Sequence, residues 1–554
     1  MRTYLPYFLS SLMFMGVLSG CARQEIRESR DNVPATISVE AASLGLRQQV
    51  EGSLADHPLT AFGISLKAKE ILQEFYIERN FQPAWFDDNL RPTPQALALV
   101  QVIGGITPEG LLPQDYHHKR LLQMVSAQRQ DYVDYDLLLS DAAANLSRHL
   151  LMGKVNPEGI SPDWKATPRQ RDLVEVMEQL TRANDVESRL QQLRPQQVRY
   201  VRLLKLLGQL NEKTPGDWRA LPRAPAIKPG ANDARLPVIR ARLQFWGDLA
   251  TDELVANATY YDEILEAAVK HFQERHGLDV DGIIGAGTLD ALNVTPATRR
   301  QQVINNLERW RWLADDFGER HVLVNIAGFE LKVIDNNQTV MRKPVIVGRD
   351  YRRTPVFSDR IRYLVFNPTW TVPHKLAVKD KLPDIQADPS YLTRLGFTVF
   401  DQQQNRVDPM KVDWSKITER NFSYRLVQSP GPLNALGQVK FMFPNQYDVY
   451  LHDTPSRELF SKAGRAFSSG CVRVAEPLEL AALLLEGNGM TRAQIDEIIA
   501  KGEQQTVFLK NPVPVHIEYW TAWIDSNNQL NFRNDIYERD PPLATALAAP
   551  LYAH

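Results

Sequence analysis

Ser468-Ser469-Gly470-Cys471-Val472-Arg473 lies near the end of the chain and holds one of only 2 cysteines among 554 residues. The other cysteine, Cys21, follows Leu18-Ser19-Gly20 near the start. A cysteine that carries a lipid forms no disulfide, so acylation of Cys21 would leave Cys471 as a single thiol outside the cytoplasm, where unpaired thiols are prone to oxidation. We therefore expect Cys471 to be a reactive group.

Residues 1–21 have the pattern of an export signal. Arg2 precedes an apolar run from Leu5 to Leu18 that is too short to cross a bilayer, for which about twenty apolar residues are needed. The run ends in a sequence that resembles the bacterial lipoprotein signal, in which the cysteine receives lipid and becomes the mature N-terminus; an ordinary secretory signal is the alternative. We therefore expect a lipoprotein in the periplasm of a Gram-negative bacterium. Because Ala22 and not Asp follows Cys21, we expect its anchor in the outer membrane and not in the inner membrane.

The charge of the chain is nearly balanced, with 64 Lys and Arg against 66 Asp and Glu. No basic block indicates a nucleic-acid partner. Asp87-Asp88, His117-His118 and the pair Asp134 with Asp136 lack a closing set of metal ligands. We therefore expect these pairs in solvated loops, and we expect neither a metal nor another cofactor.

The length predicts several domains, since single cores stop growing near about 250 to 300 residues. Residues 22–56 have the composition of a polar tether. Residues 57–225 predict a helical scaffold domain, in which Leu138, Ala142, Leu146 and Leu150 repeat every four residues. The Pro-rich stretch Leu221–Pro229 indicates a linker.

Residues 235–295 predict a second module. Val269, Phe272 and Gln273 fall on one helical face, Gly277 suits a left-handed C-cap, and Asp281-Gly282 suits a turn. The pattern resembles the small three-helix peptidoglycan-binding domain, AVxxFQxxxGLxxDGxxGxxT. The resemblance implies binding to peptidoglycan, and a role as a spacer is the alternative.

Beyond Trp312 the apolar residues alternate with a period of two, which predicts a mostly β domain at 320–510 and a C-terminal extension at 511–554. Residues 374–428 interrupt this pattern and predict a long insertion over the site, of the kind that often acts as a lid. A helix is predicted after Cys471, and its dipole would stabilise the thiolate.

His452 is the candidate proton acceptor, because it ends the strand-like run Tyr447–His452 before the cysteine. A structural histidine and a small buried thiol are the alternative reading of this pair. With Asn434-Ala435-Leu436-Gly437 and Phe443-Pro444-Asn445, these motifs resemble the YkuD-type L,D-transpeptidases over about 320–509. The order of scaffold, peptidoglycan-binding and catalytic domains resembles their long YcbB-like branch. The usual Ser-His-Gly-Cys is Ser-Ser-Gly-Cys here, so the family's second histidine is absent.

The resemblance implies a cysteine-dependent acyltransferase that forms 3→3 cross-links between peptidoglycan stems. His452 would accept the proton of Cys471, whose thiolate attacks a tetrapeptide stem and releases D-alanine; an amine of diaminopimelate on a second stem then attacks the thioester. Backbone amides at Gly470 and Ser469 would hold the oxyanion. A backbone carbonyl near this Ser-Gly pair would orient the histidine. Carbapenems are the expected covalent inhibitors.

Arg473 and Arg465 are candidates for binding stem carboxylates, because a guanidinium pairs with a carboxylate bidentately; an ion pair within the fold is the alternative for each. Tyr450 lies two residues before His452, on the same face of the strand, and is a candidate for lining the pocket. Two other functions stay open: an L,D-carboxypeptidase, in which water resolves the thioester, and a non-catalytic scaffold that binds the wall.

Overall fold

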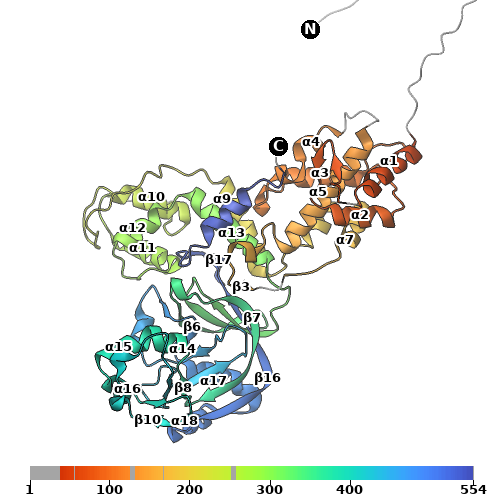
Figure 1. Ribbon diagram of the computed structural model, residues 1–554. Coiled ribbons are helices and arrows are strands. Elements are labelled where there is room, and N and C mark those ends of the chain that lie inside the picture. Colours follow the sequence, from red (N-terminus) through yellow and green to blue (C-terminus); the bar gives the residue numbers. More distant parts are fainter. Residues whose placement is uncertain (1–37, 55, 125–130, 166–167, 251–256, 553–554) are drawn as a thin grey trace, which may run out of the picture.

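The structure, a computed structural model, describes residues 38–54, 56–124, 131–165, 168–250 and 257–552 (Figure 1). The expected signal peptide and Cys21 lie outside these residues. The expected fold class is confirmed: a helical scaffold domain, a small three-helix module and a mostly β domain follow one another along the chain. In Figure 1 the two helical parts lie above the β domain. In the described ranges, no helix is long and apolar enough to span a membrane.

The scaffold domain is built around one long helix, α5 (Tyr132–Met152), whose residues Leu138, Ala142, Leu146 and Leu150 are all buried as the sequence predicts. A short hairpin, β1 (Thr60–Ala61) with β2 (Ile64–Ser65), packs beside it. The other helices are α1 (Val39–Gly52), α2 (Lys69–Glu78), α3 (Pro94–Gly104), α4 (His118–Leu121), α6 (Pro157–Ile160), α7 (Leu173–Thr181), α8 (Val186–Gln191) and α9 (Val198–Glu212).

The prediction of a polar tether up to residue 56 is wrong for α1. The hydroxyl of Ser38 caps this helix by accepting a hydrogen bond from the Ala41 amide at 3.4 Å. Ala42, Leu46 and Val50, spaced four apart, are buried on one face of the helix. The prediction relied on the mostly polar composition of this segment and overlooked the spacing of its apolar residues. That spacing is enough to pack a helix against a neighbouring core.

The prediction of solvated loops is wrong for Asp136 and His117. Asp136 is buried and accepts hydrogen bonds from the Tyr76 hydroxyl at 2.6 Å and from the Trp85 amide at 2.9 Å. The Nε2 atom of His117 lies 2.8 Å from the buried carboxylate of Asp141. Buried polar groups need such partners, so these residues hold the scaffold domain together. Within the described ranges, no three His, Cys, Asp or Glu residues are grouped to hold a metal ion.

The three-helix module consists of α10 (Leu236–Trp246), α11 (Glu263–His276) and α12 (Ala286–Asn293). Gly277 caps α11 with a φ of 66°, the left-handed conformation that the sequence predicts. The predicted linker is part of this module, since Leu221 and Ile227 are buried in its core. The proline-rich composition suggested a free connection, yet Ile227 also forms an isolated β-bridge with Ile284.

A long helix that the sequence analysis did not assign, α13 (Pro296–Arg311), leads from the module to the β domain. It buries several charged and amide side chains. Arg309 forms an ion pair with Asp540 at 2.7 Å, and Asn306 bonds to Thr521. Both partners belong to the C-terminal extension, so this helix joins the domains through polar contacts.

The β domain is a closed sheet. Its strands run in the order β12-β13-β15-β6-β5-β4-β16-β7, and β7 also pairs with β12, which closes the sheet into a barrel. Two of the contacts that matter for the site, β13 with β15 and β14 with β6, are parallel. The strands are β4 (Arg320–Asn325), β5 (Glu330–Asp335), β6 (Gln338–Gly348), β7 (Val356–Phe366), β12 (Val439–Met442), β13 (Leu451–His452), β14 (Ala466–Ser468), β15 (Val472–Val474) and β16 (Gln505–Glu518).

Strands and helices from other parts of the chain pack on or extend the barrel. β3 (Trp164–Lys165), from the scaffold part, pairs with β7. The expected boundary at residue 510 falls inside β16, whose pairing with β4 continues to Glu518. The barrel also carries two helices, α17 (Pro477–Leu485) and α18 (Arg492–Lys501), where the sequence indicated one. The extension adds the hairpin β17 (Ala522–Ile524) with β18 (Leu530–Phe532), and α19 (Asp540–Ala548).

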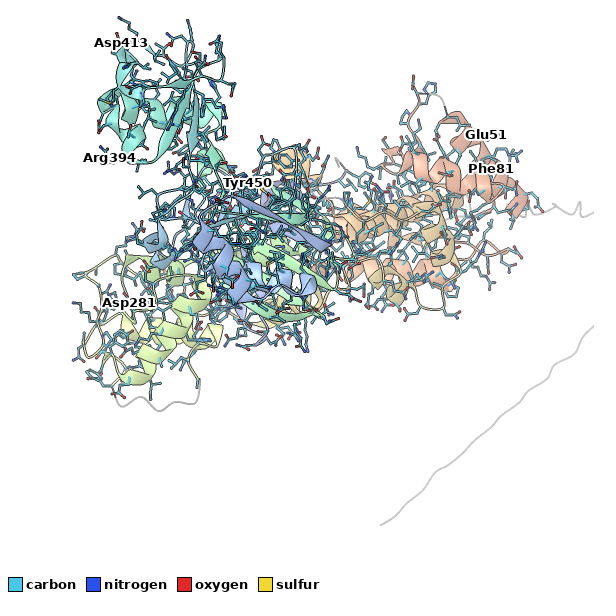
Figure 2. The ribbon with its side chains drawn as sticks, turned by 90° about the horizontal axis from the view of Figure 1, so that it is seen from below. Glu51, Phe81, Asp281, Arg394, Asp413 and Tyr450 are labelled. Atoms are coloured by element: carbon cyan, nitrogen blue, oxygen red, sulfur yellow. The ribbon has the colours of Figure 1, made fainter. Side chains whose placement is uncertain are left out.

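The predicted long loop is a folded lobe, called here the insertion lobe (residues 370–428). It has a four-stranded sheet in the order β10-β9-β11-β8 and a core of its own that includes Ile385, Trp414 and Leu426. Figure 2 shows it projecting from the barrel, with Asp413 at its outer end and Tyr450 labelled near its base. Its elements are β8 (Trp370–Thr371), α14 (His374–Leu376), α15 (Leu382–Ala387), α16 (Ser390–Arg394), β9 (Phe397–Phe400), β10 (Arg406–Val407) and β11 (Arg425–Gln428).

Candidate active site

Two parallel strands bring the predicted site residues to one face of the barrel. In the pairing of β13 with β15, Leu451 lies opposite Val472 and His452 lies opposite Arg473. Leu451 and Val472 are fully buried in the barrel core. Because side chains alternate along a strand, His452 and Arg473 point to the other face, and Tyr450 and Cys471, each two residues earlier, join them there. Sequence reasoning placed Tyr450 with His452, but it did not predict the parallel pairing that adds Cys471.

His452 is held in a defined orientation. It is 5% exposed, and its Nδ1 atom lies 2.5 Å from the backbone carbonyl of Asp453. Because a carbonyl only accepts hydrogen bonds, Nδ1 carries the proton and Nε2 is left as a proton acceptor. The expectation of a carbonyl near the Ser-Gly pair is therefore wrong, since the carbonyl belongs to the residue next to the histidine. The ring also packs edge-on against Tyr450, with 5.6 Å between ring centroids.

Electrostatic surroundings keep His452 neutral. Burial, with the positive charges of Arg473 and Lys440, lowers the pKa of His452 to about 3. Lys440 lies directly opposite His452 on β12, and its Nζ sits 5.7 Å from the centre of the Tyr450 ring. Sequence reasoning gave Lys440 no role in the site, because its place opposite His452 depends on the register of two strands. The imidazole thus enters any reaction as a free base.

Cys471 is partly exposed and its thiol is protonated at rest. Its Sγ atom donates to the backbone carbonyl of Asp448 at 3.6 Å. Burial raises the pKa of Cys471 to about 11, and hydrogen bonds from the backbone amide and the hydroxyl of Tyr450 act in the opposite direction. The expectation of a thiolate stabilised by a helix dipole is wrong, because β15 follows the cysteine and α17 begins only at Pro477. Stabilisation of the sulfur comes from Tyr450 instead.

The segment before the cysteine, called here the nucleophile loop (residues 467–471), is pinned by side-chain bonds. Gly470 has a φ of 119°, a conformation that favours glycine. Its amide donates to Ser468 Oγ at 3.1 Å, and that hydroxyl donates to the Cys471 carbonyl at 2.5 Å. The Gly470 amide is thus already engaged, and Ser469 is exposed with its Oγ accepting from Arg352 at 2.9 Å. The predicted oxyanion role of the Gly470 amide therefore conflicts with its bond to Ser468 Oγ, whereas the predicted role of the Ser469 amide stays a prediction.

The two candidate arginines differ. Arg473 lies on the site face, and its pKa is lowered by burial and by the nearby charge of Arg349. The Nε atom of Arg473 is buried and has no hydrogen-bond partner among the described residues. Arg465, in contrast, donates to the carbonyls of Val345, Lys462 and Phe329 at 3.2, 2.6 and 3.0 Å. The predicted substrate role of Arg465 therefore has no structural support, because its donors hold the barrel.

Comparison with known families assigns all three domains. Residues 319–507 match the family described as "L,D-transpeptidase catalytic domain". Residues 233–292 match the "Putative peptidoglycan binding domain". Residues 70–207 match the family described as "Scaffold domain".

Individual relatives agree with the family assignment. A curated protein of Haemophilus influenzae, named "Putative L,D-transpeptidase", is 38% identical over 240 residues, which are 43% of this chain and 48% of that protein. The chain thus spans about half the length of this curated relative.

Two solved L,D-transpeptidases are more distant. The structure from Stackebrandtia nassauensis shares 12% identity and covers 52% of this chain and 94% of its own, with a TM-score of 0.22. The structure from Mycobacterium smegmatis shares 11% and covers 36% of this chain and 58% of its own, with a TM-score of 0.17. Scores this low carry no argument about the fold. The assignment depends on the family matches, which show that the chain contains a YkuD L,D-transpeptidase catalytic domain, joined to a peptidoglycan-binding domain and a scaffold domain.

Proposed function

We propose that this protein is a peptidoglycan L,D-transpeptidase that forms 3→3 cross-links, with Cys471 as nucleophile and His452 as general base. The observation that carries the proposal is the shared face of β13 and β15, which presents His452, Tyr450, Arg473 and Cys471 together. A nucleophile needs a base and an orienting group for that base. The Asp453 carbonyl supplies the orienting group.

The resting protonation states define the first step. Since the pKa values of about 11 for Cys471 and about 3 for His452 leave both groups neutral, no preformed ion pair activates the thiol. The proton passes from Sγ to Nε2 of His452 as the sulfur bonds to the stem carbonyl. The thiol first leaves the Asp448 carbonyl, to which it donates at rest. The tetrahedral intermediate then expels D-alanine, which takes the proton from the imidazolium and leaves a thioester on the cysteine.

Substrate charge assists this proton transfer. The imidazolium forms beside Arg473 and Lys440, whose positive charges oppose it. A stem carboxylate bound by Arg473, whose Nε has no hydrogen-bond partner in the described part of the chain, would neutralise part of that charge. Binding of the acidic stem therefore raises the basicity of His452 at the moment when it is needed.

The second step requires an acceptor amine. The side-chain amine of diaminopimelate on a neighbouring stem attacks the thioester and forms the 3→3 link, while His452 takes its proton. Carbapenems, whose strained lactam carbonyl a thiolate opens, would acylate the same sulfur. The peptidoglycan-binding domain holds the glycan near this reaction.

Placement of the enzyme follows from the sequence signal. We propose that Cys21 carries the lipid that anchors the protein to the outer membrane, facing the periplasm of a Gram-negative bacterium. Cys21 then takes no part in redox chemistry with Cys471, and the single thiol stays free to react.

The direct test is incubation of the protein with a purified disaccharide tetrapeptide, followed by mass spectrometry of the products. Cross-linked dimers that have lost one D-alanine per link support the proposal. Trimmed tripeptide stems without dimers would identify an L,D-carboxypeptidase instead. Unchanged substrate with a folded protein would leave only a wall-binding scaffold.

A further inference from the structure

The nucleophile loop rests on a second segment, called here the support loop (residues 349–354). The amide and Nε of Arg349 donate to the carbonyls of Ser468 and Phe467, each at 3.1 Å. Thr354 Oγ1 donates to the Gly470 carbonyl at 2.8 Å. The support loop therefore fixes the backbone on the approach to Cys471.

Arg352, in this support loop, contacts two separate parts of the domain. Its guanidinium forms a bidentate ion pair with Asp380 of the insertion lobe, with 2.6 Å between Nη2 and Oδ1. The Nη1 atom also donates to Ser469 Oγ at 2.9 Å. The arginine side chain is 13% exposed, and the Asp380 carboxylate is 35% exposed. Ionic hydrogen bonds hold the pKa of Asp380 below its usual range.

Asp380 occupies an unusual backbone position. It lies in a single π-helical turn, Ala377–Lys381, between α14 and α15. Such a turn inserts one extra residue into a helix, and turns of this kind are concentrated at functional sites. Here the turn follows β8 and α14 in the insertion lobe, and the Asp380 carboxylate that it carries contacts Arg352 of the support loop.

We propose that Arg352 is a positioning residue that couples docking of the insertion lobe to the placement of Cys471. When Asp380 holds the guanidinium, Nη1 donates to Ser469, two residues before the cysteine. When the lobe is displaced, the guanidinium is free to rotate and Ser469 loses its donor. The position of the Cys471 thiol thus depends on whether the insertion lobe is docked on the support loop. This inference rests on the proposed role of Cys471.

The chemistry of position 469 fits this role. A hydroxyl accepts a hydrogen bond from a guanidinium, as Ser469 Oγ does from Arg352. Ser469 is exposed, so packing does not hold its side chain, and Arg352 is the donor that the structure assigns to it. Loss of a hydrogen bond to a charged group typically lowers the affected rate or equilibrium by about tenfold or more.

The test is a double-mutant cycle on the rate of acylation by a carbapenem, followed by intact-protein mass spectrometry. Asp380→Asn and Ser469→Ala should each slow acylation about tenfold. If both act through Arg352, the double variant should be no slower than either single variant. Rates that multiply to about a hundredfold loss would overturn the coupling, as would a change of less than about twofold for Asp380→Asn.

Additional variants separate positioning from loss of fold. Ser469→Thr keeps the hydroxyl and should react within about threefold of the parent. Arg352→Lys keeps the positive charge but cannot bind Asp380 and Ser469 with a planar guanidinium, so its acylation rate should fall about tenfold. This variant tests the inference even if Asp380→Asn fails to fold. Asp413→Asn, which breaks an exposed ion pair with Lys416 within the lobe, is a matched control that should leave the rate unchanged.

The outcome also distinguishes this inference from the proposed function. If the carbapenem adduct maps to Cys471 while Asp380→Asn reacts like Asp413→Asn, the coupling is wrong and the nucleophile stands. If Cys471→Ala is acylated as fast as the parent, the proposed function itself is wrong, and the coupling with it.

Discussion

The resting state of Cys471 leads to a distinctive dependence of its reactivity on pH. Burial raises the pKa of this thiol to about 11. At pH 7 about one molecule in ten thousand then carries the thiolate, whereas an ordinary cysteine with a pKa of about 8.5 is a few per cent ionised. The thiolate is the form that reacts with an alkylating agent. The rate of alkylation of the free enzyme should therefore be several hundredfold below that of an exposed thiol.

The assay is alkylation by iodoacetamide across a pH series, with the label quantified on the tryptic peptide Ala466–Arg473. Because the folded pKa lies above the assay range, the rate should rise about tenfold per pH unit from pH 7 to pH 10 without a plateau. Tyr450→Phe removes a hydrogen bond that stabilises the thiolate, so it should slow alkylation about tenfold at any pH in this range. A plateau below pH 8 would show a preformed thiolate–imidazolium pair and refute the reasoning.

Three further outcomes are expected, two from the geometry and one from the N-terminal sequence. His452→Ala should slow acylation by a tetrapeptide stem by about 100-fold or more, measured by stopped flow. The slope of the iodoacetamide labelling rate against pH should stay unchanged in this variant. Acylation at the parent rate would mean that the histidine is only structural. Gly437→Ala places a Cβ 2.3 Å from the Asp453 carboxyl at a φ of 61°, so thermal denaturation should show a loss of about 2 kcal/mol, whereas Gly464→Ala, which meets open space, should show little. Cys21→Ser should abolish lipidation, so the protein should no longer sediment with membranes. An unlipidated N-terminus on the mature parent protein would contradict the anchor.

Local patterns predicted the parts of the site that depend on strand alternation. Tyr450 and His452 lie two residues apart, and the period of two alone places them on one face. The motif around Cys471 predicted this residue as the nucleophile, which stays a prediction. Neither pattern shows that β13 and β15 are parallel neighbours, because strand pairing over a long loop depends on the closure of the whole barrel.

Other features depend on contacts between distant segments, which local patterns do not encode. Arg352 contacts Asp380 and Ser469, which lie 28 and 117 residues away along the chain. The lobe was expected as a loop, because its short strands and helices bury residues that are scattered along the sequence. The helix expected next to Cys471 starts later, since the apolar residues Val472 and Val474 complete the barrel first.

The central claim, a thioester on Cys471, is tested most directly by trapping it. The protein is mixed with a disaccharide tetrapeptide, quenched in acid within seconds and analysed by intact mass and peptide mapping. The expected result is a mass gain equal to the substrate less D-alanine, located on the peptide Ala466–Arg473 and absent from Cys471→Ala. An adduct that persists in Cys471→Ala, or one that maps to another residue, would contradict the account.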